Sequence, residues 1–226
     1  MAEVARPSRG ALLLFLFKLF IVFPVLLFLP AGTLHFWQGW TLWGLFAVLI
    51  ATGGGYFLKR NPALIQRRGP AAEQETSQKI IIAVLIILFL AEFIVPGLDH
   101  RFGWSHVPPA IVIAGDLLVA IGFLIIFLTF KVNSFAAATI AIETGQKVVT
   151  TGPYRVVRHP MYVGMLFVLT FLPVALGSYW GLLIAPFIFL TIVWRLLDEE
   201  RYLSKNLLGY AEYCQSTHYR LIPSVW

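Results

Sequence analysis

Two stretches in the C-terminal third hold most of the residue types that could do chemistry. The first is Gln146–Gly164, QKVVTTGPYRVVRHPMYVG, and the second is Trp194–Leu203, WRLLDEERYL. The chain between these stretches forms two apolar runs, Met161–Leu176 and Tyr179–Leu197. Only a short turn separates the two runs. A helical hairpin with a short turn brings its two open ends together. The side chains expected to meet there are Arg158, His159, Tyr162, Arg195, Asp198, Glu199 and Glu200.

The local spacing indicates an anion-binding helix start. Pro160 suits the first turn of a helix, where its missing N–H has no partner to lose. His159 would then stand at the helix start, where free N–H groups and the positive end of the dipole favour a carboxylate or phosphate. On the second helix, Arg195 and Glu199 are four residues apart and share a face, in the less favourable order for a simple stabilising pair.

Each of these residues also has a simpler interpretation. His159 could be a capping side chain, and Arg158 and Arg195 could be charges that fix membrane orientation. Tyr154 and Tyr162 could be interfacial aromatics, and the glutamates could end a solvated helix. It is less economical to assume that all of these simpler interpretations hold together, at both ends of one hairpin.

The elements that position these residues are expected to be membrane helices. The chain has 226 residues, of which 59% are hydrophobic and only 12% charged, whereas a soluble domain is nearer a quarter charged. One cysteine, Cys214, excludes an internal disulfide and a cysteine-rich metal site, and no metal is expected. The net charge of +6 does not indicate nucleic-acid binding, because the basic residues lie between apolar runs.

Six apolar runs predict an all-α integral membrane protein with about six transmembrane helices. A helix needs about 20 residues to cross the hydrocarbon layer, so the third and fifth runs are short. Pro24 predicts a kink in the first run, and Gly53, Gly54 and Gly55 predict close helix packing in the second. The runs are Ala11–Leu29, Phe36–Leu58, Ile80–Val95, Val107–Phe130, Met161–Leu176 and Tyr179–Leu197.

The basic residues predict the orientation and the division of the chain. Of 17 Lys and Arg residues, only Arg101 falls in a loop on the opposite side from the rest, so both termini are expected to be cytoplasmic. We expect residues 1–130 to hold four transmembrane helices and a cytoplasmic loop at 59–79. Residues 131–226 are expected to hold the cofactor-binding and catalytic region, with the hairpin 161–197 and a cytoplasmic tail.

At these residues the sequence resembles the isoprenylcysteine carboxyl methyltransferase family, and more distantly the phospholipid N-methyltransferases. The resemblance lies in GPY-x-x-x-RHP-x-Y-x-G at Gly152–Gly164 and R-x-x-x-EE-x-x-L at Arg195–Leu203. It continues in G-Y-x-x-Y at Gly209–Tyr213 and R-x-x-P at Arg220–Pro223. Upstream segments such as KVNSFAAATI resemble bacterial members, which implies a multi-pass protein of a bacterial inner membrane.

The resemblance implies methyl transfer from S-adenosylmethionine to a lipophilic or lipidated acceptor from the bilayer, a carboxylate above all. Arg195 would orient the acceptor, and Glu200 or Asp198 would be the base that an amine acceptor requires. Membrane lipids are the other expected partners. The cofactor site implied is Gln146, Lys147, Val148, Val149, Tyr154, Arg158, His159, Pro160, Met161, Tyr162 and Glu199.

Two other classes stay open at this point. One is an NADPH-dependent sterol-type membrane reductase, for which the basic segment Arg60–Arg68 would bind the 2′-phosphate. The other is a non-catalytic membrane receptor or scaffold that keeps the fold. A transporter fits less well, because the spans carry few ionisable residues beyond Lys18, Glu92 and Asp116.

Overall fold

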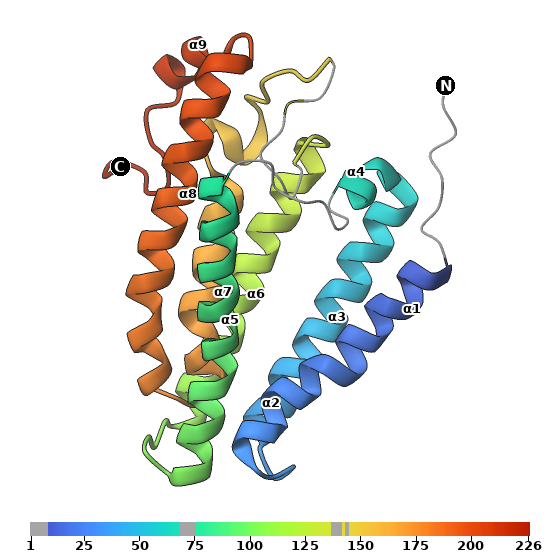
Figure 1. Cartoon of the computed structure of the whole chain (residues 1–226), viewed down its shortest axis with the longest axis vertical. Coiled ribbons are helices and arrows are strands. Elements are labelled where there is room, and N and C mark those ends of the chain that lie inside the picture. The colour runs from blue at the N-terminus through green and yellow to red at the C-terminus, as the bar shows by residue number, and fades with distance from the viewer. Residues whose placement is uncertain (1–8, 68–75, 137–141, 143–144) are drawn as a thin grey trace.

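The computed structural model describes residues 9–67, 76–136, 142 and 145–226, and every regular element in them is a helix. Figure 1 shows α5 to α8 as an upright bundle, from which α1 and α2 lean away. The elements are α1 (Arg9–Phe17), η1 (Lys18–Val22), α2 (Phe23–Ala31), α3 (Trp37–Arg60), α4 (Pro62–Arg67), α5 (Thr76–Phe102), α6 (Pro109–Val132), η2 (Gly152–Arg155), α7 (Pro160–Ala175), η3 (Trp180–Ile184), α8 (Ala185–Asn206) and α9 (Tyr210–Ser216).

The predicted all-α membrane fold is confirmed. Within the described residues, four helical stretches are long and apolar enough to cross a bilayer, namely Trp37–Arg60, Ser77–Phe102, Pro109–Val132 and Trp180–Asn206. Lys18–Ala31 and Pro160–Ala175 are apolar but shorter. These six stretches correspond to the six predicted runs, while the number of crossings stays a prediction.

The lengths of two elements differ from expectation. The third run was expected to be short, yet α5 has 27 residues and continues through Pro96 to Phe102. Polar residues at both of its ends keep helical geometry, so apolar composition alone underestimates the helix. The predicted loop 59–79 is correspondingly shorter. Lys59 and Arg60 complete α3, α4 follows, Lys79 lies in α5, and residues 68–75 are outside the described residues.

A π-helical turn lies just before Pro24, where the sequence predicts a kink. This turn, η1, joins α1 to α2, and Pro24 follows in the first turn of α2. Proline lacks the N–H that would bond four residues back, and its ring crowds that carbonyl. A wider turn just before it separates the groups that would otherwise clash.

Close helix packing occurs between α6 and α7, not at the predicted triple glycine. A Cβ added to Gly122 would lie 2.7 Å from the Gly164 carbonyl oxygen, and one added to Gly115 would lie 2.6 Å from the Ala175 nitrogen. These contacts allow the two backbones to touch, as small residues do in membrane helix pairs. A Cβ added to Gly54 or Gly55 would meet no described atom of a neighbouring element within 4 Å, and one added to Gly53 would meet Phe127 at an ordinary 3.8 Å, so the prediction of close packing there is wrong.

A buried acidic residue fixes the turn of the C-terminal hairpin. Asp99, near the end of α5, accepts hydrogen bonds from the Ser105 amide and hydroxyl, both at 2.6 Å, and from the Ser178 hydroxyl. Ser178 lies between α7 and η3, so this cluster attaches the hairpin turn to α5. Because the turn is attached to α5, the positions of the opposite, open ends of α7 and α8 relative to α5 are restricted as well.

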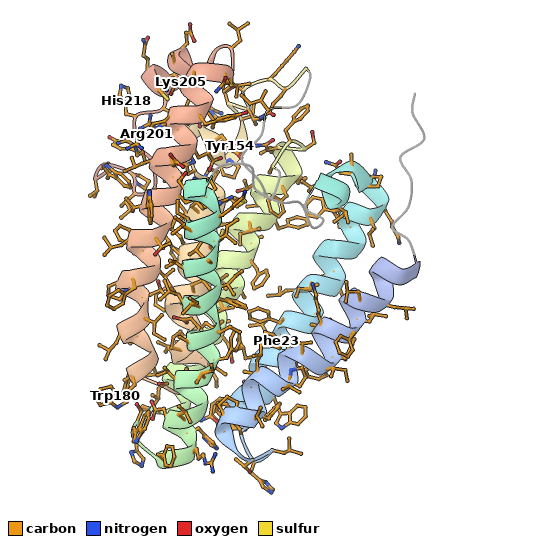
Figure 2. All side chains as sticks on the ribbon, viewed as in Figure 1. Phe23, Tyr154, Trp180, Arg201, Lys205 and His218 are labelled. Atoms are coloured by element: carbon orange, nitrogen blue, oxygen red, sulfur yellow. The ribbon has the colours of Figure 1, made fainter. Side chains whose placement is uncertain are left out.

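Polar side chains gather at the open end of the hairpin. Figure 2 shows Tyr154, Arg201, Lys205 and His218 near one end of the molecule and Trp180 near the other. In Figure 1, α1 begins at about mid-height and descends to α2, which lies at the opposite end from α9.

Candidate active site

A pocket opens at the polar end of the α6–α8 bundle. Its empty volume is about 830 Å³, which includes open solvent at its mouth. All eleven residues predicted for the cofactor line it, whereas the predicted catalytic residues Arg195 and Glu200 do not. The lining is Asn133, Phe135, Ala136, Gln146, Lys147, Val148, Val149, Tyr154, Arg158, His159, Pro160, Met161, Tyr162, Glu199, Leu203, Leu207, Tyr210 and Tyr213.

The start of α7 is held by the C-terminal tail. The Arg158 amide donates to the Tyr219 carbonyl at 2.8 Å, and the His159 amide donates to the Arg220 carbonyl at 3.1 Å. Pro160 occupies the first helical turn, as predicted. The tail therefore takes up two of the N–H groups just before α7 and fixes the direction in which the helix enters the bundle.

His159 does not act as a capping side chain, so that simpler interpretation is wrong. Its side chain makes no capping hydrogen bond to α7. Its ring atom Nε2 instead lies 3.2 Å from Glu200 Oε1, and the residue is only 6% exposed. The ring also stacks against Tyr162, with centroids 5.7 Å apart. His159 thus connects the first turn of α7 to α8.

Glu200 is the centre of a buried ionic cluster behind the pocket. Its Oε2 accepts from Arg220 Nε at 2.8 Å, and its Oε1 lies 3.3 Å from Arg158 Nε as well as near His159. Only 11% of its side chain is exposed. A carboxylate that is stabilised by several basic groups is a poor proton acceptor. The geometry therefore favours an anchoring role for Glu200, and its predicted role as a base stays a prediction.

Tyr162 separates the pocket from Arg195. Its hydroxyl donates to Glu199 Oε2 at 2.5 Å and accepts from Arg195 Nε at 3.2 Å. Tyr162 is 3% exposed and Arg195 is 8% exposed. The shared face of Arg195 and Glu199 does point toward α7, as the spacing predicted, and both residues meet the same phenol. Arg195 thus lies one side chain beyond the pocket wall.

Arg195 is linked to Asp198 through a third residue. Arg195 Nη1 donates to Gln78 Oε1 at 2.7 Å, and Gln78 Nε2 donates to Asp198 Oδ2. Asp198 also accepts from the Ser77 hydroxyl at 3.0 Å. Asp198, one of the side chains expected to meet at the open end of the hairpin, is thus joined to Arg195 through Gln78. The start of α5 contributes Gln78 to this cluster.

Three tyrosines form the aromatic side of the pocket, of which Tyr210 and Tyr213 are buried and Tyr154 is half-buried. The Tyr154 hydroxyl accepts from Asn133 Nδ2 at 2.7 Å, and the Tyr213 hydroxyl donates to the Tyr154 carbonyl at 2.8 Å. Burial, opposed by the Asn133 hydrogen bond and assisted by the charge of Glu199, raises the pKa of Tyr154 to about 12. Burial likewise raises the pKa of Tyr210 and Tyr213. All three phenols are therefore neutral near pH 7.

Tyr210 carries an unsatisfied polar atom in the pocket wall. The residue is 4% exposed, and within the described part of the chain its hydroxyl has no hydrogen-bond partner. A buried hydroxyl without a partner is costly. An acceptor atom on a bound molecule would satisfy it, so this atom indicates that the pocket holds a polar ligand.

Sequence reasoning missed several residues of this site. Gln78 has no local signal, because a glutamine before an apolar run usually faces solvent. Asn133 lies within KVNSFAAATI, which carried a resemblance but no role. Tyr210, Tyr213 and Arg220 lie in motifs that were recognised without an assigned function. Their contacts appear only when the tail folds back onto α7 and α8.

The fold and the pocket define a class, a helical membrane protein with a polar site at one end of its apolar bundle. Residues 110–208 match the phospholipid methyltransferase family, which confirms the predicted resemblance to the isoprenylcysteine carboxyl methyltransferase-like membrane methyltransferases. The match covers α6 to α8 and most of the pocket lining, and supports a methyltransferase. No curated protein matches this chain.

Proposed function

We propose that this protein transfers a methyl group from S-adenosylmethionine to the carboxylate of a lipophilic acceptor. The observation that carries the proposal is the pocket itself. It lies in the region that matches the methyltransferase family and is lined by every residue that the family resemblance places around the cofactor. Arg60, which begins the basic segment that a reductase would use for a 2′-phosphate, does not line this pocket.

The lining fits the chemical groups of this cofactor. Glu199 is a hydrogen-bond acceptor suited to an amino group or ribose hydroxyls. Arg158, Lys147 and the unsatisfied Tyr210 hydroxyl can serve the carboxylate, since each is a donor in the pocket wall. Val148, Val149 and Met161 offer apolar surface for a purine ring. The pocket therefore provides acceptors, donors and apolar contacts together.

The arrangement of charges favours a carboxylate acceptor over an amine. When bound, the cofactor supplies an electrophilic methyl group on a sulfonium, and transfer to a carboxylate breaks a C–S bond and forms a C–O bond with no proton to move. An amine would first have to lose a proton to a base. Asp198 is engaged by Ser77 and Gln78, and Glu200 by its basic partners. Neither carboxylate is placed as a free base.

Arg195 is the group best suited to hold the acceptor. It is buried beside the pocket wall, and a guanidinium binds a carboxylate through two parallel hydrogen bonds. Its position between α5 and α8, within apolar helices, suits an acceptor that arrives from the bilayer with its charged group at the interface.

The proposal is tested with purified protein in detergent and methyl-tritiated S-adenosylmethionine. N-Acetyl-S-farnesylcysteine serves as the carboxylate acceptor and phosphatidylethanolamine vesicles as the amine acceptor. Alkali releases methyl esters as volatile methanol but leaves N-methyl groups in place. Base-labile label on the farnesylcysteine supports the proposal, and stable label on the phospholipid overturns it in favour of N-methylation.

A binding measurement separates the other classes. Calorimetric titration with S-adenosylhomocysteine should give saturable binding, and titration with NADP⁺ should give none. Binding of NADP⁺ alone would indicate the reductase class. Binding of S-adenosylhomocysteine with no transfer to either acceptor would indicate a scaffold that keeps the site.

A further inference from the structure

We infer that Gln78, at the start of α5, is a positioning residue that holds the Arg195 guanidinium in the orientation needed for the acceptor. The inference rests on the proposed function, because it concerns the same acceptor group. Gln78 lies outside residues 110–208, the region that matches the methyltransferase family. The N-terminal part of the chain would thus contribute directly to acceptor recognition.

The first observation is the position of the side chain. Gln78 is only 1% exposed, although it stands in the first turn of α5 at the polar end of the molecule. Long polar side chains at such helix ends normally reach solvent, because burying an amide without partners is costly. Here the amide is turned inward, between α5 and α8, and it is satisfied at both of its ends.

The second observation is the pairing of the amide. Oε1 accepts from Arg195 Nη1 at 2.7 Å, and Nε2 donates to Asp198 Oδ2. A guanidinium can only donate and an ionised carboxylate can only accept. The two neighbours therefore fix which end of the amide points which way. An amide is suited to this place because it offers an acceptor and a donor at opposite ends of one short planar group.

The third observation is what the pairing does to Arg195. Nε is held by the Tyr162 hydroxyl at 3.2 Å and Nη1 by Gln78 at 2.7 Å. A planar group that is held at two of its nitrogens has a fixed plane and direction, so its remaining N–H bonds have fixed directions as well. Gln78 thereby converts a long, flexible cation into a rigid one before the acceptor binds. Such preorganisation improves binding because less conformational freedom is lost on binding.

The neighbouring residue provides a matched control. Ser77 donates to the same Asp198 oxygen from the same helix turn, whereas Gln78 bonds to Arg195 as well. Ser77→Ala removes a bond between α5 and α8 and leaves the Arg195–Gln78 contact in place. If activity depends only on tight packing of α5 against α8, Ser77→Ala should lower it. If activity depends on the orientation of Arg195, Ser77→Ala should leave it unchanged.

The experiment measures the steady-state kinetics of Gln78→Met, which keeps the length of the side chain without its hydrogen bonds. With N-acetyl-S-farnesylcysteine, we expect kcat/KM to fall about threefold to tenfold, the range for one hydrogen bond, with most of the change in the acceptor KM. The affinity for S-adenosylhomocysteine should stay within about twofold of wild type, which also shows that the variant is folded. Ser77→Ala should stay within about twofold in every constant.

A double-mutant cycle distinguishes positioning from plain structural support. If Gln78 acts through Arg195, Gln78→Met should cause little further loss of kcat/KM in a protein that already carries Arg195→Met. If the two residues act independently, the losses from the two substitutions should add. Three results would each overturn the inference while leaving the proposed function intact. They are additive losses of kcat/KM in the cycle, a loss in Ser77→Ala equal to that in Gln78→Met, and an unchanged acceptor KM in Gln78→Met. Transfer by the wild type to the amine alone would refute the proposed function, and the inference with it, because no carboxylate would then meet Arg195.

Discussion

Replacement of Glu200 distinguishes a structural anchor from a catalytic base. Its carboxylate is 11% exposed and faces Arg220, Arg158 and His159 at 2.8, 3.3 and 3.2 Å. Removing one member of a buried ionic cluster leaves the others uncompensated and costs about 3–5 kcal/mol. For a chain of this size, each kcal/mol lowers the melting temperature by about 2–4 °C. Glu200→Gln should therefore lower the apparent melting temperature by roughly 6–20 °C.

The assay is thermal unfolding in mild detergent, followed by tryptophan fluorescence, with Glu212→Gln as the matched control. Glu212 is an exposed carboxylate on α9, so its replacement should leave the melting temperature unchanged. Well below its own melting temperature, Glu200→Gln should keep kcat within about threefold, because Glu200 does not line the pocket. An unchanged melting temperature combined with a hundredfold loss of kcat would refute the anchoring role and restore the role of base.

The remaining predictions concern the cofactor, the acceptor, the bilayer and the core. Glu199→Gln should weaken S-adenosylhomocysteine binding about tenfold or more by losing a charge-assisted hydrogen bond, measured by calorimetry; unchanged affinity in a monodisperse sample would remove Glu199 from the site. Arg195→Lys should keep that affinity and lower turnover roughly tenfold to a hundredfold; equal losses of both would place Arg195 in the cofactor shell. Reporter fusions should place both termini in the cytoplasm, and a periplasmic signal at the C-terminus would contradict six crossings. Glu92 is fully buried in α5, and neither of its carboxylate oxygens has a hydrogen-bond partner within the described residues, so Glu92→Met should raise the apparent melting temperature; a lower value would mean that the acid is stabilised in the membrane.

Short-range sequence patterns predicted the local structure of the site well. Pro160 marks the start of α7, and the spacing of Arg195 and Glu199 placed both on the face that meets Tyr162. These features depend on helical periodicity and on the chemistry of single residues, which a sequence states directly. The six apolar runs could also be identified from the sequence, because the bilayer sets the length and composition of any helix that crosses it.

Contacts between distant segments were decided only by the tertiary structure. The sequence put close packing at Gly53–Gly55, whereas it occurs at Gly115, Gly122 and Gly164, because a small residue allows close approach but does not choose its neighbour. The sequence offered Glu200 as a candidate base, and only the tertiary structure shows Arg220, twenty residues further along, folded back onto it. Gln78 gave no signal at all, since its partners are 117 and 120 residues away. Periodicity and residue type determined which helices form and which face of each is polar. Only the packing of α5 against α8, and of the tail against α7, decided which charges neutralise one another and which remain for a ligand.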